Sequence, residues 1–284
     1  MHTPPAEEPI GRVASLHRYP VKSVGGEDME AVDLTAGGVL GDRAFAFRDS
    51  ATGYVVSAKR PKKWPGILGW KASFTAATEH EGELPPVEVT LADGLSLKSS
   101  EKSRLEAEVS RALDAPVTLE RARPEGSTFE YHWPDIEGLV YQGRTYRDEV
   151  TSHDTPSGTF FDSSTINLLT TASLEKMRML AAPSLFELER FRPNLVVEPM
   201  GSEPGFIENS WVGGVLAIGE TARIRVTSPC LRCVMVNLGR GPMPADPRIL
   251  KAVFAHNDGN LGVKGDIAAA GPISVGDLVF RVPA

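Results

Sequence analysis

The chain has 284 residues, of which 41% are hydrophobic and 24% charged, as in globular proteins with one large domain or two packed domains. The formal net charge of -7 argues against a general nucleic-acid surface, because phosphate binding requires clustered cations. The N-terminus lacks a basic segment followed by an apolar run, and no window reaches the ~20 apolar residues that span a bilayer. We therefore expect a cytoplasmic protein that binds neither nucleic acid nor membrane.

The first part of the chain reads as short strands separated by turns. Strand-like composition is found at residues 12–21, 31–35, 43–49 and 53–60. The last two segments predict a hairpin, and residues 86–100 predict another around Asp93-Gly94. Leu105, Val109 and Leu113 recur at i, i+4 and i+8, which predicts an amphipathic helix within residues 100–115.

Residues 121–158 are rich in Pro, Gly, Asp and His and lack a period, so we expect a long irregular connection. A domain boundary is placed there, between residues 9–122 and residues 123–284. Beyond it, helices are predicted at residues 172–182, 185–191 and 247–255, and strands at residues 164–170, 194–198, 212–220, 222–228, 233–238 and 277–283. The predicted fold class is mainly β with accessory helices (α+β), arranged as two packed β-barrel-like domains.

Both cysteines of the chain lie in one short segment, SPCLRCVM, at residues 228–235. Pro229 cannot donate to a strand ladder, so we expect the preceding strand to end there and Cys230 to begin a corner. Alternation of apolar residues resumes with Val234 and Val236, which predicts that Cys233 is the first residue of the next strand.

Several roles are compatible with this pair of cysteines. A secreted disulfide framework is excluded, because one pair cannot staple a domain of this size. A structural zinc site lacks a second cysteine pair, and a thioredoxin-like dithiol would stand at a helix N-terminus rather than between strands. Two buried cysteines that only fill space, and a thiolate bound to a soft metal, are the remaining alternatives.

Six motifs in order point to one family: LHRYPVKSVGG, GVLGDRAFAF, FFDSSTINLLTTAS, RFRPNLVVE, ENSWVGGVLAIGETARIRVTSPCLRCVMVNL and GNLGVKGDIAAAGPISVGDLV. From about residue 10 to the C-terminus the chain resembles the MOSC (molybdenum cofactor sulfurase C-terminal) domain proteins that carry an N-terminal MOSC β-barrel domain. It is similar in type to the mitochondrial amidoxime-reducing components and their bacterial relatives. The resemblance implies an N-terminal MOSC β-barrel domain followed by a MOSC domain.

The resemblance also implies a molybdenum–molybdopterin cofactor with Cys233 as catalytic and metal-ligating residue, whereas Cys230 matches a position that is not a ligand. The residues that match cofactor-binding positions are Lys22, Ser23, Arg43, Asp162, Ser163, Ser164, Arg192 and Asn194. Arginine suits phosphate through its bidentate fork, and lysine, serine and asparagine supply a point charge or adaptable hydrogen bonds. Considered singly, Arg43 beside Asp42 is compatible with a surface ion pair, and Asp162 with a turn residue.

The activity implied by the resemblance is the reduction of small N-hydroxylated compounds, such as amidoximes, hydroxylamines and N-hydroxylated bases. No segment carries the four cysteines of a [2Fe–2S] ferredoxin, so a separate ferredoxin or flavin reductase is the expected electron donor. Two alternatives remain open: a sulfur or molybdenum-cofactor carrier that uses a Cys233 persulfide or metal-bound thiolate, and a β-barrel module without catalysis.

Overall fold

The computed structural model describes residues 8–79, 82–122, 125–133, 136, 140–141, 144–145, 149–155, 158–201 and 203–282. Its strands are β1 (Gly11–Arg18), β2 (Glu27–Met29), β3 (Ala31–Thr35), β4 (Gly38–Val39), β5 (Phe45–Asp49), β6 (Lys71–Phe74), β7 (Val87–Thr90), β8 (Ser96–Lys98), β9 (Val117–Arg121), β10 (Thr128–Trp133), β11 (Val140–Tyr141), β12 (Arg144–Thr145), β13 (Glu149–Asp154), β14 (Ile166–Thr170), β15 (Leu195–Pro199), β16 (Val215–Ile218), β17 (Ala222–Leu231), β18 (Asn260–Ala269), β19 (Gly271–Ser274) and β20 (Leu278–Val282).

Among the described residues, helices are fewer than strands. The α-helices are α1 (Lys102–Leu113), α2 (Thr171–Leu180) and α3 (Arg248–Asn257). The 3-10 helices are η1 (Ile67–Gly69), η2 (Ser99–Glu101), η3 (Leu188–Arg190), η4 (Ile207–Trp211) and η5 (Val234–Asn237). In the described part of the chain, none of the helices combines the length and the apolar character needed to cross a membrane.

The largest sheet closes on itself as a barrel. Its strand order is β15-β14-β18-β17-β16-β20-β1-β2, and antiparallel pairing of β1 with β15 joins the two sides. Val13, Leu168, Leu216 and Val263 are at most 1% exposed and belong to one apolar core inside it. Closure removes the free edges that an open sheet would expose. The barrel therefore takes β1 from the beginning of the chain and its other closing strands from the second half.

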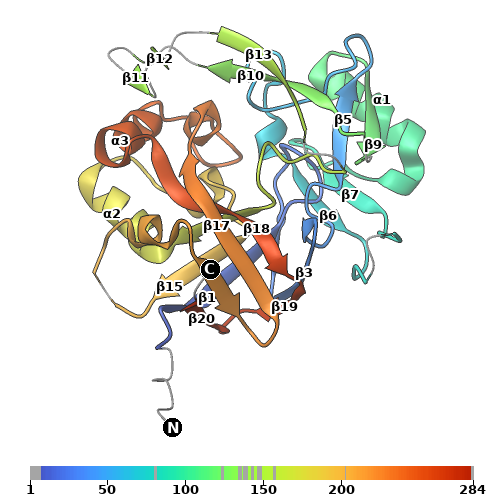
Figure 1. Ribbon diagram of the computed structural model, residues 1–284. Coiled ribbons are helices and arrows are strands. Elements are labelled where there is room, and N and C mark those ends of the chain that lie inside the picture. The colour runs from blue at the N-terminus through green and yellow to red at the C-terminus, as the bar shows by residue number, and fades with distance from the viewer. Residues whose placement is uncertain are drawn as a thin grey trace.

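A second β unit packs beside the barrel (Figure 1). It consists of the β5–β9 pair, the β6–β7–β8 meander and helix α1 around a separate core. Leu105, Val109 and Leu113 are buried in that core, which confirms the predicted amphipathic helix. The β7–β8 hairpin is confirmed as well, and Gly94 takes the positive φ of 87° that its turn requires.

Helices α2 and α3 cover the side of the barrel opposite α1 (Figure 1). Met177, Ile249, Leu250 and Val253 are fully buried between them and the sheet. The prediction of a mainly β fold with accessory helices and two packed β units is confirmed. The division between residues 9–122 and 123–284 stays a prediction, and residue 123 lies outside the described residues.

The prediction of an irregular connection over residues 121–158 is wrong for part of its length. β10 and β13 pair antiparallel over six residues each, from Thr128 opposite Asp154 to Trp133 opposite Glu149. Phe129, Tyr131 and Trp133 alternate along β10, and Phe129 is 0% exposed. This period of two was visible in the sequence, but the surrounding Pro, Gly and charged residues obscured it. Figure 1 shows the β10–β13 hairpin extending between the two β units.

Candidate functional site

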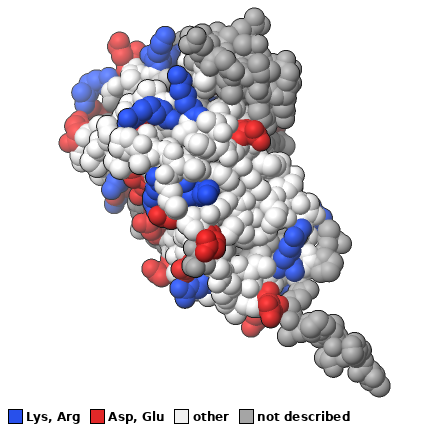
Figure 2. Space-filling view, turned by 90° about the vertical axis from the view of Figure 1, so that its left-hand side faces the viewer, with Lys and Arg blue, Asp and Glu red and all other residues white. Residues whose placement is uncertain are grey.

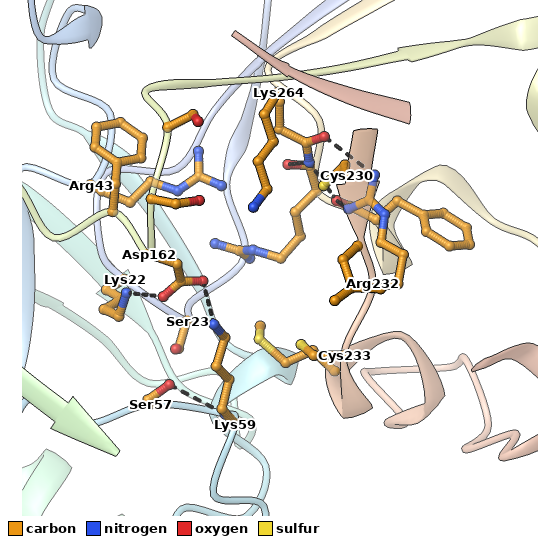
Figure 3. A pocket seen from close by; sticks show the side chains of 18 of the residues that line it. Lys22, Ser23, Arg43, Ser57, Lys59, Asp162, Cys230, Arg232, Cys233 and Lys264 are labelled. Carbon is orange, nitrogen blue, oxygen red and sulfur yellow. Dashed lines mark hydrogen bonds and ion pairs between the residues drawn. The ribbon is translucent and has the colours of Figure 1, made fainter. Parts of the chain in front are cut away.

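A cavity of about 380 Å³ lies between the barrel and the second β unit. Its walls come from strands and from the loops beside them, and loops are where binding residues are often found. Figure 3 shows basic and polar side chains directed into it from several elements. It is lined by every residue that the sequence predicts for the site: Lys22, Ser23, Arg43, Asp162, Ser163, Ser164, Arg192, Asn194 and Cys233.

The segment that carries Cys233 differs from its predicted structure. β17 continues through Pro229 and Cys230 to Leu231, and its register against β18 shifts on both sides of Pro229. Proline is tolerated at such bulges, so it does not end the strand. Cys233 begins no strand but precedes the 3-10 helix η5, in which the Val236 amide donates to the Cys233 carbonyl. The short alternation of Val234 and Val236 reflects burial within that turn rather than a strand.

The two cysteines differ in exposure, although both line the cavity as free thiols. Cys230 is buried and 7% exposed, whereas Cys233 is half-buried. Within the described ranges, no three His, Cys, Asp or Glu side chains gather into a group that could hold a metal ion. Cys233 is thus the more accessible of the two thiols that line the cavity. A ligand that brings its own additional donors is compatible with that arrangement.

Arg232, between the cysteines, fixes this segment to its neighbours. Its Nε donates to the Leu261 carbonyl at 2.7 Å and its Nη1 to the Phe191 carbonyl at 3.0 Å. Nη2 reaches the Asn167 side-chain oxygen at 3.2 Å. Because these partners come from β18, from β14 and from the loop before β15, Arg232 positions the backbone that presents Cys233.

Opposite Cys233, Asp162 joins two buried lysines. Its carboxylate accepts from Lys22 Nζ at 2.7 Å and from Lys59 Nζ at 2.8 Å. Burial lowers the pKa of Lys22 to about 8 although Asp162 opposes this shift. Burial alone would lower the pKa of Lys59. Interactions with Asp162, Tyr131 and Cys233 have the larger, opposite effect, so the pKa of Lys59 is raised. Burial would raise the pKa of Asp162, yet the two ammonium groups hold it well below its usual range.

Two arginines of the site stack on one tyrosine. The guanidinium carbons of Arg43 and Arg192 lie 4.4 Å and 4.2 Å from the ring centroid of Tyr19. Arg43 pairs with Asp42, whereas Arg192 donates to the Val24 carbonyl at 2.7 Å. Burial, and then the nearby Arg43 charge, lower the pKa of Arg192 to about 9. Two guanidinium groups thus lie close together in the lining of the cavity, and the Asp42 carboxylate pairs with Arg43.

Asn194 is a structural as well as a lining residue. It is 1% exposed, donates to Asp42 Oδ2 at 2.8 Å and accepts from the Asn167 amide at 3.2 Å. Ser23 is also engaged, because its hydroxyl accepts from the Ala58 amide at 3.0 Å. Both side chains therefore hold the walls of the cavity in place.

Backbone strain is concentrated at the site. Among the described non-glycine residues, a positive φ occurs at Ser23 (66°), Arg43 (47°), Arg192 (51°), Asp114 and Asp258. The two aspartates follow the ends of α1 and α3, where the left-handed conformation is common. The other three line the cavity. Such strain persists only where surrounding structure enforces it, and it clusters at functional sites.

Several lining residues were missed by the sequence analysis. Lys59 is buried, and its Nζ lies 3.4 Å from the ring centroid of Tyr131. Tyr131, Trp133 and His153 extend from the β10–β13 hairpin, and Lys264 extends from β18. The aromatic alternation along β10 was the available signal for the hairpin residues. No local pattern distinguishes Lys59 or Lys264 from a solvated lysine.

The positive charge of the cavity is a local feature. Asp162 is the one acidic residue among the described residues that line it, against the basic residues Lys22, Arg43, Lys59, Arg190, Arg192, Arg232 and Lys264. The face in Figure 2 instead mixes basic and acidic side chains across wide uncharged areas. The cavity is therefore suited to an anion in a chain whose net charge is negative.

Comparison with protein families gives two matches in sequence order. Residues 10–108 match the family model of the MOSC N-terminal beta barrel domain, and residues 155–280 match that of the MOSC domain. The first match includes Lys22, Ser23 and Arg43, and the second includes the other predicted site residues. No curated protein sequence matches the chain significantly.

Solved structures similar to the chain are distant in sequence. The YuaD protein from Bacillus subtilis is 12% identical, with 96% of each chain covered and a TM-score of 0.45. YiiM from Geobacillus stearothermophilus is 16% identical over 42% of this chain and 54% of that chain, with a TM-score of 0.33. YiiM from Escherichia coli is 19% identical over 45% and 58%, also with a TM-score of 0.33.

Proposed function

Because the chain belongs to the MOSC-domain proteins, which are associated with the molybdenum cofactor, we propose that it is a molybdenum-dependent reductase of N-hydroxylated compounds. The observation that carries this proposal is the position of Cys233. It is the half-buried thiol of a cavity whose basic lining comes from both β units. A soft thiolate beside a cationic pocket suits a metal that arrives with an anionic organic ligand.

The residues present fit such a cofactor. Its pterin carries a phosphate, and Lys22, Arg43 and Arg192 supply positive charge in the same cavity. Ser163 and Ser164 have no hydrogen-bond partner among the described residues, so their hydroxyls are free for pterin or phosphate atoms. The backbone is strained at Arg43 and Arg192, because both residues have a positive φ, and both side chains line the same cavity. Strain of this kind is typical of sites that bind a ligand.

The chain's own residues have distinct roles in this proposal. When bound, the cofactor supplies two electrons, which with two protons convert an N–OH group into N–H and water. Cys233 would hold the metal, and Arg232 orients the segment that carries Cys233. Tyr131 and Trp133 form an aromatic wall that limits water near the reacting group. A separate ferredoxin or flavin reductase is proposed as the source of electrons.

The test uses the full chain made in a host that synthesises the cofactor. Molybdenum content is measured by mass spectrometry and benzamidoxime reduction is measured with reduced methyl viologen, which replaces the unidentified electron donor. We expect stoichiometric molybdenum and turnover in the wild type, loss of activity in Cys233→Ser, and retention of both properties in the matched control Cys230→Ser. Equal molybdenum content and equal reduction in the wild type and Cys233→Ser would overturn the proposal.

A cofactor or sulfur carrier is separated by the same measurements. Molybdenum that binds through Cys233 without reduction of amidoximes, hydroxylamines or N-hydroxylated bases would favour the carrier. Transfer of cofactor to an apo-enzyme would then be the decisive assay. Bound molybdenum without turnover with any donor would therefore reject the reductase and favour the carrier.

A further inference from the structure

Among the residues that the structure describes, Lys264 is the basic residue of the cavity whose side chain has no partner. It lies on β18, is half-buried and lines the cavity, with its amine directed inward (Figure 3). Among the described residues, its side chain has no hydrogen bond or ion pair. A lysine whose ammonium enters a cavity without a counter-charge gains stability when an anion enters.

The other basic residues of the cavity are already engaged. Lys22 and Lys59 bind Asp162, and Arg43 pairs with Asp42. Arg192 donates to the Val24 carbonyl, and Arg190 and Arg232 donate to several backbone carbonyls. Because Asp162 serves two lysines, no described carboxylate of the lining is left for Lys264. An external anion is the remaining source of negative charge.

Two serine hydroxyl groups line the same cavity and precede the strand that pairs with the strand of Lys264. Lys264 is the Cα partner of Asn167 on β14, and Ser163 and Ser164 lie in the turn just before that strand. Both serines line the same cavity and are unpartnered within the described ranges. A point charge with two hydroxyl donors is a set that binds the tetrahedral or planar oxygens of phosphate and carboxylate.

We propose that Lys264, with Ser163 and Ser164, forms an oxyanion site that binds a phosphate or carboxylate group within the cavity. This deepens the proposed function, on which it rests for the origin of the anion: either the phosphate of the cofactor or an acidic group of the substrate. Binding of the oxyanion itself requires neither molybdenum nor turnover. The site is therefore testable even if the proposed activity is wrong.

The first test measures binding of inorganic phosphate to the full chain without cofactor, by isothermal titration calorimetry. Lys264→Gln should weaken phosphate binding about tenfold, equivalent to about 1.4 kcal/mol. Lys264→Arg should restore most of the affinity. Lys251→Gln, which removes an exposed lysine on α3 away from the cavity, is the matched control and should match the wild type. An unchanged affinity in Lys264→Gln, with an unchanged melting temperature, overturns the proposal.

The second test identifies the source of the anion in cofactor-loaded protein. If the anion is the cofactor phosphate, Lys264→Gln should retain less molybdenum after dialysis than Lys251→Gln does. If the anion belongs to the substrate, molybdenum content should be unchanged, while KM for 4-carboxybenzamidoxime rises about tenfold and KM for neutral benzamidoxime stays constant. A wild-type KM for both compounds and full molybdenum content would contradict the role of Lys264 in the loaded protein.

Discussion

Lys59 Nζ lies 2.8 Å from Asp162 Oδ2. This ion pair joins a loop of the second β unit to the loop that leads into β14 of the barrel. Only 7% of the Lys59 side chain is exposed, against 39% for Asp162. Lys22 approaches the other carboxylate oxygen at 2.7 Å. One partly exposed carboxylate thus compensates two buried ammonium groups, and it does so at the wall of the candidate site.

Asp162→Asn should therefore destabilise the protein. Removing one partner of a fully buried pair costs about 3–5 kcal/mol, and the partial exposure of Asp162 reduces the expected loss to roughly 2 kcal/mol. Urea unfolding of both proteins measures the difference. The control is Glu198→Gln, which breaks the exposed pair with Arg12 and should cost less than about 1 kcal/mol. Equal losses in the two variants would contradict this prediction.

The effect of Asp162 should also depend on pH. Its pKa is held below that of the unfolded chain, so its stabilisation is fully present above about pH 4 and is lost as the pH falls toward the lower folded-state pKa. The difference in unfolding free energy between the wild type and Asp162→Asn should accordingly shrink in acid. A difference that grows below about pH 4 would show that the lysines are not the source of the shift.

Anion binding should weaken as Lys22 loses its proton. Burial lowers the pKa of Lys22 to about 8, so much of its charge is lost between neutral pH and about pH 9. Sulfate is the appropriate probe, because its own charge is constant in this range. Its affinity for the protein without cofactor should fall about tenfold over the interval. Lys22→Arg keeps the charge at this position, so its affinity for sulfate should fall clearly less than that of the wild type, and the remaining fall should come from Arg192, whose pKa is about 9.

Much of the fold was predictable because its signals are local. The helix at Leu105, Val109 and Leu113 and the hairpin at Asp93-Gly94 depend on period and turn composition within short windows. The strand through Pro229 was not predictable. A proline is tolerated inside a strand where the pairing with the neighbouring strand has a bulge, and here the register of β17 against β18 shifts around Pro229. That register is set by β18, which lies later in the chain.

The same distinction applies to the candidate site. Motif resemblance selected the residues that line the cavity, Cys233 among them, but it did not find Lys59 or Lys264. Lys59 is buried through contacts with Asp162 and Tyr131, and both of these belong to distant segments. Lysine burial of this kind depends on tertiary packing, so no local pattern could have indicated it.

Positive φ should have opposite consequences at a helix end and in the cavity. Asp114 is exposed, takes φ 50° after α1 and has no side-chain hydrogen bond among the described residues, so Asp114→Gly should stabilise the protein by about 0.5–1 kcal/mol. Arg43→Gly relieves similar strain but removes the pair with Asp42 and the stacking on Tyr19. It should lower both stability and molybdenum content. Thermal unfolding and metal analysis measure these effects, and a gain of stability in Arg43→Gly would contradict the argument.

Glu208 should make stability depend on pH away from the cavity. It is 0% exposed, and its Oε2 accepts from Thr170 at 2.6 Å and Ser173 at 2.7 Å, while its Oε1 has no hydrogen-bond partner in the described part of the chain. Burial raises its pKa, so its contribution is fully present below the unfolded value of about 4.3 and is lost as the pH rises through the higher folded-state pKa. Glu208→Gln keeps an acceptor for both hydroxyls and carries no charge. We therefore expect the variant to gain about 1–3 kcal/mol relative to the wild type between acidic and mildly alkaline pH, as measured by urea unfolding. Parallel curves for the two proteins would show that the buried carboxyl is not the titrating group.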